Sequence, residues 1–205
     1  INPESGYVFS TNNPYPNSDP SFKHTGYYSP IYRELVADEA LKNEDQWTVE
    51  KMKTLQTASV NTRWSNIKPY LNNALNAKTL NQTEQKALRY LNEWDGVYDG
   101  GSVAASVFER FYFHVFQGLY LDEVGEDLLS KFIKNGISDN SLYGLLQNPN
   151  ALWWDRIDTD EVETQQDVLM NAFLSAVQSL NQELGADVAN WHWKDTAGLT
   201  HPHPL

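Results

Sequence analysis

The spacing of apolar residues constrains this fold most, because it is helical from about Ile31 onward. Within residues 103–121 one row of apolar side chains recurs at every fourth position: Val103, Val107, Phe111, Val115 and Leu119. Further apolar residues occupy the other faces of the same segment. A helix that is apolar on most of its faces belongs in a protein core. We therefore predict a mainly α fold with a central buried helix that is capped by Ser102 and runs toward Leu121.

Capping residues and prolines divide the first part of the helical region. Apolar residues within 35–41 mark a first short helix. Thr48 can cap a second helix, because a Thr hydroxyl accepts a hydrogen bond from the first turn. We expect that helix to continue toward Leu75 with an interruption or kink at Pro69, since proline removes a helical hydrogen bond.

Four further helices are expected after residue 80. A capping box at residues 81–84 precedes one of them. Shorter helices are expected over 126–134 and 141–147. An acidic start at 160–163 introduces a last long helix, and Gly185 ends it.

The first 30 residues differ from the rest. Residues 7–11 carry β-forming side chains and predict one short strand. Residues 12–20 contain three prolines, which predict an irregular loop because proline restricts the residue before it. With no repeat or linker in the chain, we predict a single unit over 1–205, with a strand and Pro-rich loop arm over 1–30 and helices over 31–205.

Charge and composition exclude several functions. The chain has 15 Lys and Arg against 27 Asp and Glu, a formal net charge of −12. Such an acidic surface repels phosphate backbones, so we expect no nucleic-acid partner. No segment reaches the roughly 18 apolar residues that a membrane span needs. The chain has no cysteine, which excludes disulfides and a cysteine nucleophile.

The chain begins at Ile1 and has no signal peptide pattern. It ends at Leu205 without a polar tail. Both features lead us to expect a piece of a longer protein.

The isolated residues indicate little chemistry. His201 and His203 could chelate a metal, but no third ligand has a recognisable spacing. His114 lies in the most apolar helix, which favours a core histidine over a catalytic base. The acidic clusters at 122–123 and 158–161 are typical of solvated helix starts. No known nucleophile or phosphate-loop motif is present.

The order of several short motifs carries a resemblance. They are Asn2-Pro3 with Gly6-Tyr7-Val8, Asn12-Asn13, Tyr15-Pro16 with Ser18-Asp19, Tyr32-Arg33, Met52 with Leu55-Gln56, Trp94-Asp95-Gly96, Ser102 with Ala104-Ala105, Trp153-Trp154-Asp155, Trp191 with Trp193, and His203-Pro204-Leu205. In this order the chain resembles the penicillin amidase family of N-terminal-nucleophile hydrolases, in the second half of the β subunit. We interpret the tryptophans as packing residues rather than substrate contacts.

The resemblance implies a larger αββα enzyme whose Ser, Thr or Cys nucleophile is released by self-cleavage. Ile1 has no hydroxyl or thiol, so the chain alone is expected to be inactive. The implied partners are the remainder of the acylase, which is its α subunit and the first part of β, and a small N-acyl amide such as a β-lactam or an acyl-homoserine lactone. The implied location is periplasmic or secreted. The alternative is a non-catalytic helical interaction module.

The resemblance also implies roles for three residues. Asn12 matches an oxyanion-hole amide, although Asn also favours ordinary loops. Arg33 matches a substrate-orienting guanidinium, and its alternative is a surface arginine paired with Glu34 or Asp38. Asp19 matches a ligand of a structural calcium, and its alternative is a turn residue before Pro20.

Overall fold

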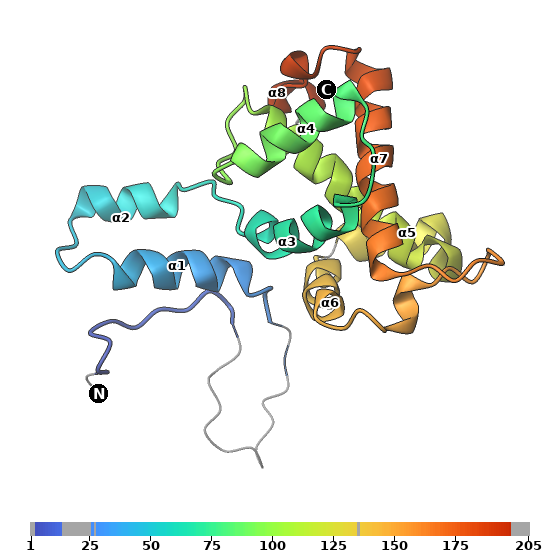
Figure 1. Ribbon diagram of the computed structural model, residues 1–205. Helices are drawn as coiled ribbons and strands as arrows, with labels where there is room; N and C mark the ends of the chain where they lie inside the picture. Colours follow the sequence, from blue (N-terminus) through green and yellow to red (C-terminus); the bar gives the residue numbers. More distant parts are fainter. Residues whose placement is uncertain (1–2, 14–25, 27, 135, 198–205) are drawn as a thin grey trace, which may run out of the picture.

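The computed structural model describes residues 3–13, 26, 28–134 and 136–197 (Figure 1). Within these ranges the chain is helical, which confirms the mainly α prediction. The elements are α1 (Tyr32–Lys42), α2 (Val49–Gln56), α3 (Arg63–Leu75), α4 (Gln82–Glu93), α5 (Val103–Lys134), α6 (Ile137–Leu146), the 3-10 helix η1 (Leu152–Trp154), α7 (Gln165–Leu184), the 3-10 helix η2 (Val188–Asn190) and α8 (Trp193–Thr196).

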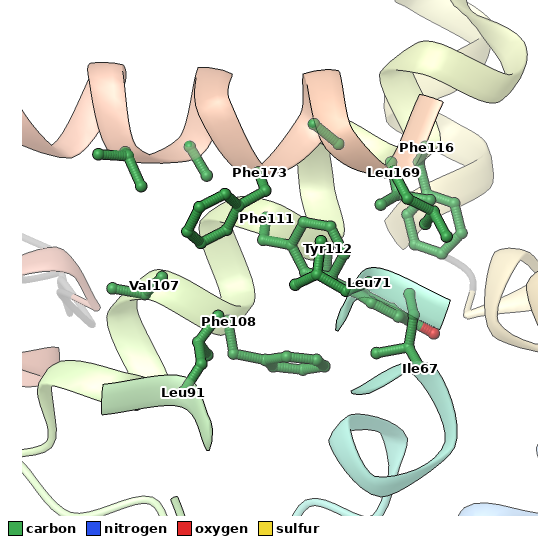
Figure 2. Packing of buried hydrophobic residues seen from close by; sticks show 14 of the residues in the cluster. Ile67, Leu71, Leu91, Val107, Phe108, Phe111, Tyr112, Phe116, Leu169 and Phe173 are labelled. Carbon is green, nitrogen blue, oxygen red and sulfur yellow. The ribbon is translucent and has the colours of Figure 1, made fainter. Parts of the chain in front are cut away.

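Helices α5 and α7 pack against each other at the centre of a bundle that α3 and α4 cover. Figure 2 shows side chains from these four helices directed into one apolar cluster. Phe108, Phe111 and Phe173 in this cluster are fully buried. Burying a large apolar side chain contributes about 1.5–3 kcal/mol. The central helix predicted from its apolar faces is therefore confirmed.

Two tryptophans complete the core, as expected of packing residues, whereas Trp153 was expected to pack as well and is 44% exposed. Trp154 and Trp191 are fully buried. Their indole nitrogens donate to the carbonyl oxygens of Asn148, at 3.0 Å, and Gly185, at 2.8 Å. Burial without such acceptors would leave each indole N–H unsatisfied, so these bonds allow the rings to occupy the core.

The predicted second helix is two helices, and the break does not lie at Pro69. Helix α2 ends at Gln56, and Pro69 lies on the exposed side within α3. The chain turns at residues 57–62. Asn61 supports this turn two residues before α3, because its Oδ1 accepts the backbone N–H of Arg63 at 2.7 Å. Thr48 caps α2 as expected, accepting from Lys51 N at 3.2 Å.

Later helix boundaries were predicted with mixed success. The capping box at 81–84 and the stop at Gly185 are confirmed. The segment after 125 is helical as expected, separated from the central helix by Gly125 at φ +73°. Helix α6 begins at Ile137, earlier than predicted.

The acidic residues at 160–163 do not start α7. Thr164 caps that helix in a capping box with Asp167. Residues 155–163 form an irregular segment closed on itself, in which Glu163 N donates to Asp155 Oδ1 at 3.0 Å. The cluster at 122–123 likewise lies inside α5, not at a helix start. Helix α7 therefore starts at the residue whose side chain and backbone form a complete capping box, and not at the cluster of acidic residues.

The strand predicted over 7–11 is wrong. Among the described residues there is no strand, only an isolated bridge between Val60 and Val97. A strand needs a neighbour to pair its backbone groups, and the described part of the chain offers none. The arm lies against α1 instead, where the Tyr7 hydroxyl donates to Asp38 Oδ1 at 2.8 Å.

Helices α1 and α2 lie beside the bundle rather than within it (Figure 1). Neither helix buries a residue. The chain joins them to the bundle at residues 59–61, which bond to the segment before α5. Asn61 N donates to Gly96 O at 2.8 Å, and Tyr98 N donates to Ser59 O at 2.9 Å.

Candidate functional site

A cavity of about 560 Å³ lies between α1, the segment 55–63 and the bundle. Its polar lining includes Ser29, Arg33, Arg63, Tyr98 and Asp139. The cavity therefore combines two guanidinium groups with a carboxylate and a phenol, a set of side chains suited to a polar ligand.

Asn12 and Arg33 meet beside this cavity. Arg33 Nη1 donates to Asn12 Oδ1 at 3.1 Å, across 21 positions of sequence. This bond uses the oxygen of the Asn12 amide, so the Nδ2 group is the part that is left to donate. Two residues singled out for separate roles are thus brought together by the fold.

The backbone of Asn12 has an uncommon conformation. Its φ is +62°, in the left-handed region, and among the described residues other than glycine no other has a positive φ. Asn tolerates this region better than most residues because its short side chain can bond locally. The carbonyl oxygen of Asn12 accepts from Ser29 N at 2.8 Å, which ties the arm to the start of α1.

Arg33 is exposed, and the alternative interpretation gave it an acidic partner. Among the ion pairs of the described residues, Asp38 pairs with Lys42, and none includes Arg33. Its guanidinium therefore keeps a positive charge at the cavity that described carboxylates do not neutralise.

A half-buried charge network around Arg63 lies along the cavity. Arg63 Nη2 donates to Glu109 Oε1 at 2.7 Å and to the Tyr98 hydroxyl at 3.2 Å. Asp139 lies 3.8 Å from Nη1, and the guanidinium carbon lies 4.9 Å from the centre of the Tyr112 ring. Burial opposes the charge of Arg63, but the carboxylate of Glu109 holds its pKa above the ordinary value. Arg63 is thus a neutralised structural charge, in contrast to Arg33.

Tyr32 joins α1 to this network. Its ring meets that of Tyr143 edge to face, with centroids 6.4 Å apart. The Thr62 hydroxyl donates to the Tyr32 carbonyl at 3.3 Å. Burial raises the pKa of Tyr32 to about 12, while the Tyr112 hydroxyl acts in the opposite direction.

The sequence interpretation missed Tyr32, Asn61, Arg63 and Tyr98 as site residues. One available signal was the position of Asn61 two residues before a helix, since Asn is a preferred capping residue. The network of Arg63 had no signal, because its partners come from distant positions, such as Glu109 and Asp139.

Other predicted residues lie apart from this site or outside the described residues. Asp19, the predicted calcium ligand, lies outside them, as do His201 and His203. His114 is half-buried between α5 and α7, and burial lowers its pKa. Its Nε2 atom is buried without a hydrogen-bond partner among the described residues. In the described ranges no cluster of three or more His, Asp or Glu side chains could hold a metal ion.

A second and larger cavity is apolar. It measures about 790 Å³ and lies between the end of α5, α6 and Trp153. Leu128 and Phe132 contribute to its lining, and the Tyr120 hydroxyl there is bonded to Ser141 at 2.8 Å. This lining presents no charged side chain from the described residues, so the smaller cavity is the candidate functional site.

Within the described residues no helix is both long and apolar enough to cross a lipid bilayer.

Comparison with known proteins yields one family. A model of the penicillin amidase family matches residues 1–205. The acyl-homoserine lactone acylase QuiP of Pseudomonas fluorescens is 29% identical over 114 residues, which are 53% of this chain and 14% of that protein. The thermostable penicillin G acylase of Alcaligenes faecalis superimposes with a TM-score of 0.69 at 19% identity, covering 93% of this chain and 38% of that one. The chain therefore spans well under half the length of either relative.

Proposed function

The chain belongs to the penicillin amidase family, and from that premise we propose that it is the helical part of an N-terminal-nucleophile acylase. The reaction is hydrolysis of the amide bond in an N-acyl compound such as a β-lactam with an acylated amine or an acyl-homoserine lactone. Relatives named as acylases of both kinds support this substrate class.

The hydrogen bond between Arg33 and Asn12 carries the proposal. Hydrolysis of an amide passes through a tetrahedral intermediate whose oxygen is negatively charged, and a fixed N–H donor stabilises that charge. Arg33 holds Oδ1 of Asn12 and leaves its Nδ2 group available as such a donor, which supports the proposal. Loss of one oxyanion donor typically costs about 2.7–4 kcal/mol in the transition state.

Arg33 has two functions in this proposal. It holds the Asn12 amide, and it lines the cavity with a charge that described carboxylates leave unpaired. A guanidinium offers parallel donors to a carboxylate or a lactone oxygen, so Arg33 orients the half of the substrate that carries this group.

The remaining parts of the enzyme come from outside this chain in the proposal. The nucleophile and its αββα core belong to the remainder of the acylase in this proposal, because the chain covers only 38% of the penicillin G acylase it resembles and has no strand among its described residues. A structural calcium is held by Asp19 together with oxygen ligands from that remainder. The location is periplasmic or secreted.

The test of Asn12 uses the complete acylase that contains this chain. Asn12→Gly removes the donor and keeps the backbone, because glycine adopts φ +62° without strain. We expect kcat to fall about 10²- to 10³-fold with little change in KM. Asn43→Gly, at an exposed asparagine at the opposite end of α1 from Arg33, is the matched control and should leave kcat close to that of the unaltered enzyme.

Self-cleavage must be verified on a gel in every variant, so that failed maturation is not taken for a catalytic defect. A near-normal kcat in mature Asn12→Gly would show that the oxyanion donors lie elsewhere. It would favour the non-catalytic interaction module for this part of the chain.

A variant of Arg33 tests the second role. Arg33→Ala should raise KM, because the guanidinium no longer holds substrate, and should also lower kcat, because the Asn12 amide loses the hydrogen bond that holds it. Arg33→Lys should restore KM only partly, because an ammonium group cannot form two parallel hydrogen bonds. Full recovery with lysine would show that charge alone is required.

A further inference from the structure

We propose that Tyr32 is a positioning residue, which fixes Arg33 and through it the Asn12 amide relative to the helical bundle. The inference rests on the proposed oxyanion role of Asn12. It concerns a residue that does not touch the reacting atoms and acts through its neighbour in sequence.

The first step is that α1 has few other attachments to the bundle. It buries none of its residues. Its described side-chain hydrogen bonds join it mainly to the arm, through Tyr7 with Asp38 and Asn12 with Arg33. The arm and α1 are thus bonded to each other, and a shift of α1 carries Asn12 with it.

The second step is that Tyr32 is where α1 meets the bundle. As the first residue of that helix, it precedes Arg33 directly. Its ring packs edge to face on Tyr143 of α6, and its carbonyl accepts from Thr62, ahead of α3. One residue therefore contacts two parts of the bundle at the end of the helix that carries Arg33.

The third step is that this anchor itself rests on a rigid support. Asp139 and Arg63, which line the same cavity as Tyr32, are held by the charge network that includes Glu109 on α5. The ring of Tyr112, in the buried core, has its centre 4.9 Å from the guanidinium carbon of Arg63. Because the neighbours of the Tyr32 ring are themselves fixed, the ring holds the start of α1 in a fixed position relative to the core.

Active sites tolerate only small displacements of their catalytic groups. A displacement of about 1 Å in a catalytic group can cost about 10²-fold in rate. Without the Tyr32 ring, α1 and the arm lose their contact with Tyr143 of α6. The Asn12 donor then moves away from the position where negative charge develops.

The experiment measures kcat and KM of mature complete acylase with Tyr32→Leu, Tyr32→Phe and the control Tyr90→Leu. Tyr90 is a partly buried tyrosine on α4 that packs on the core. We expect Tyr32→Leu to lower kcat about 10- to 100-fold, because the Asn12 donor moves, and also to raise KM, because Arg33 moves with it. Tyr32→Phe, which keeps the ring, should retain most of the rate, and Tyr90→Leu should keep a normal kcat even if its melting temperature falls.

A double variant separates this inference from the proposed function. If Tyr32 acts through Asn12, then Tyr32→Leu combined with Asn12→Gly should be no slower than Asn12→Gly alone. Multiplied losses, or a normal kcat in Tyr32→Leu, would overturn the positioning role while Asn12→Gly still supports the acylase site. A normal kcat in Asn12→Gly would overturn the oxyanion role itself and this inference with it.

If Tyr32→Leu does not mature, Tyr143→Leu applies the same test from the other side of the contact. Removing this second ring should also lower kcat, and the loss should again disappear in the Asn12→Gly background. A normal kcat in mature Tyr143→Leu would overturn the inference.

Discussion

Gly96→Ala tests how tightly the chain passes between α1–α2 and the bundle. Gly96 has φ +86°, and a Cβ atom there would lie 2.7 Å from the carbonyl oxygen of Asn61. That oxygen belongs to the backbone, so it cannot rotate away. The substitution should push apart residues 59–61 and the segment before α5, which bond to each other through Asn61 N and Gly96 O at 2.8 Å.

Two effects set the size of the expected loss. A left-handed backbone costs a residue with a Cβ about 1–2 kcal/mol. A weakened hydrogen bond between Asn61 and Gly96 costs about 0.5–1.5 kcal/mol more. We expect the free energy of unfolding to fall by about 2–3 kcal/mol.

Urea unfolding of the 205-residue chain, followed by circular dichroism, measures this loss. With a slope of about 2 kcal/mol per molar, the midpoint should fall by about 1–1.5 M without a change in slope. Two glycines serve as controls. Gly136→Ala has φ +66° and no atom within 4 Å of the new Cβ, so it measures backbone strain alone. Gly144→Ala lies in α6 with open space around it and should stabilise the chain by about 0.5–1 kcal/mol.

The comparison with Gly136→Ala decides the outcome. If Gly96→Ala loses no more stability than Gly136→Ala, then the backbone at Asn61 moves away from the new Cβ atom without lowering the free energy of unfolding. The close approach would then not hold α1–α2 in place, and the reasoning about this junction would be refuted.

Four further predictions concern the same chain. Thr164→Ala should lower stability by about 1 kcal/mol in thermal unfolding, because the hydroxyl accepts from Asp167 N at the start of α7. Phe173→Ala should cost about 3–5 kcal/mol in urea unfolding, because the ring is fully buried. Burial, followed by the hydrogen bond and charge of Asp122, raises the pKa of Glu123 from 4.5 to about 7. The folded carboxyl then binds its proton more tightly than the unfolded one, so stability should fall as pH rises through that interval, and Glu123→Gln should raise the melting temperature at pH 8 but not at pH 4. The chain alone should not release phenylacetate from a phenylacetyl amide, and turnover by the purified chain that disappears in Asn12→Gly would contradict the need for an external nucleophile.

Local signals predicted the elements of the fold well where the deciding groups are close in sequence. The capping box at 81–84 and the stop at Gly185 depend on atoms within one turn of a helix. Asn81 and Glu84 are an example, since each bonds the backbone of the other. The same signals failed when two starts competed, as at 160–163 and Thr164, because charge near a helix end is weaker than a complete capping box.

The strand prediction failed for a different reason. β-forming side chains indicate how a segment would fit a sheet, and only a neighbouring strand can satisfy its backbone groups. The described arm has hydrogen bonds to α1 instead, including the Tyr7 hydroxyl to Asp38. Sequence pattern alone cannot supply that information, because the partner is 31 positions away.

The candidate site divides in the same way. Through resemblance, the motif order proposed separate roles for Asn12 and Arg33, but it did not predict that Arg33 would bond the Asn12 oxygen. It also left out the network of Arg63, whose charge is neutralised by Glu109, 46 positions away. Side-chain chemistry is local, whereas the partner of a buried charge depends on the path of the whole chain.

By itself the sequence determined that this chain is helical, acidic and centred on the apolar segment 103–121, because periodicity and composition act through the nearest turns and through solvent. The tertiary structure decided that the Asn12 amide oxygen bonds to Arg33, that the charge of Arg63 is neutralised by Glu109 while that of Arg33 faces the cavity, and that Tyr32 attaches α1 to the bundle. These properties depend on contacts between residues far apart in the chain, such as Tyr32 with Tyr143 and Asn61 with Gly96. Such contacts exist only after the helices have packed, because burial and close approach, rather than local preference, supply their energy.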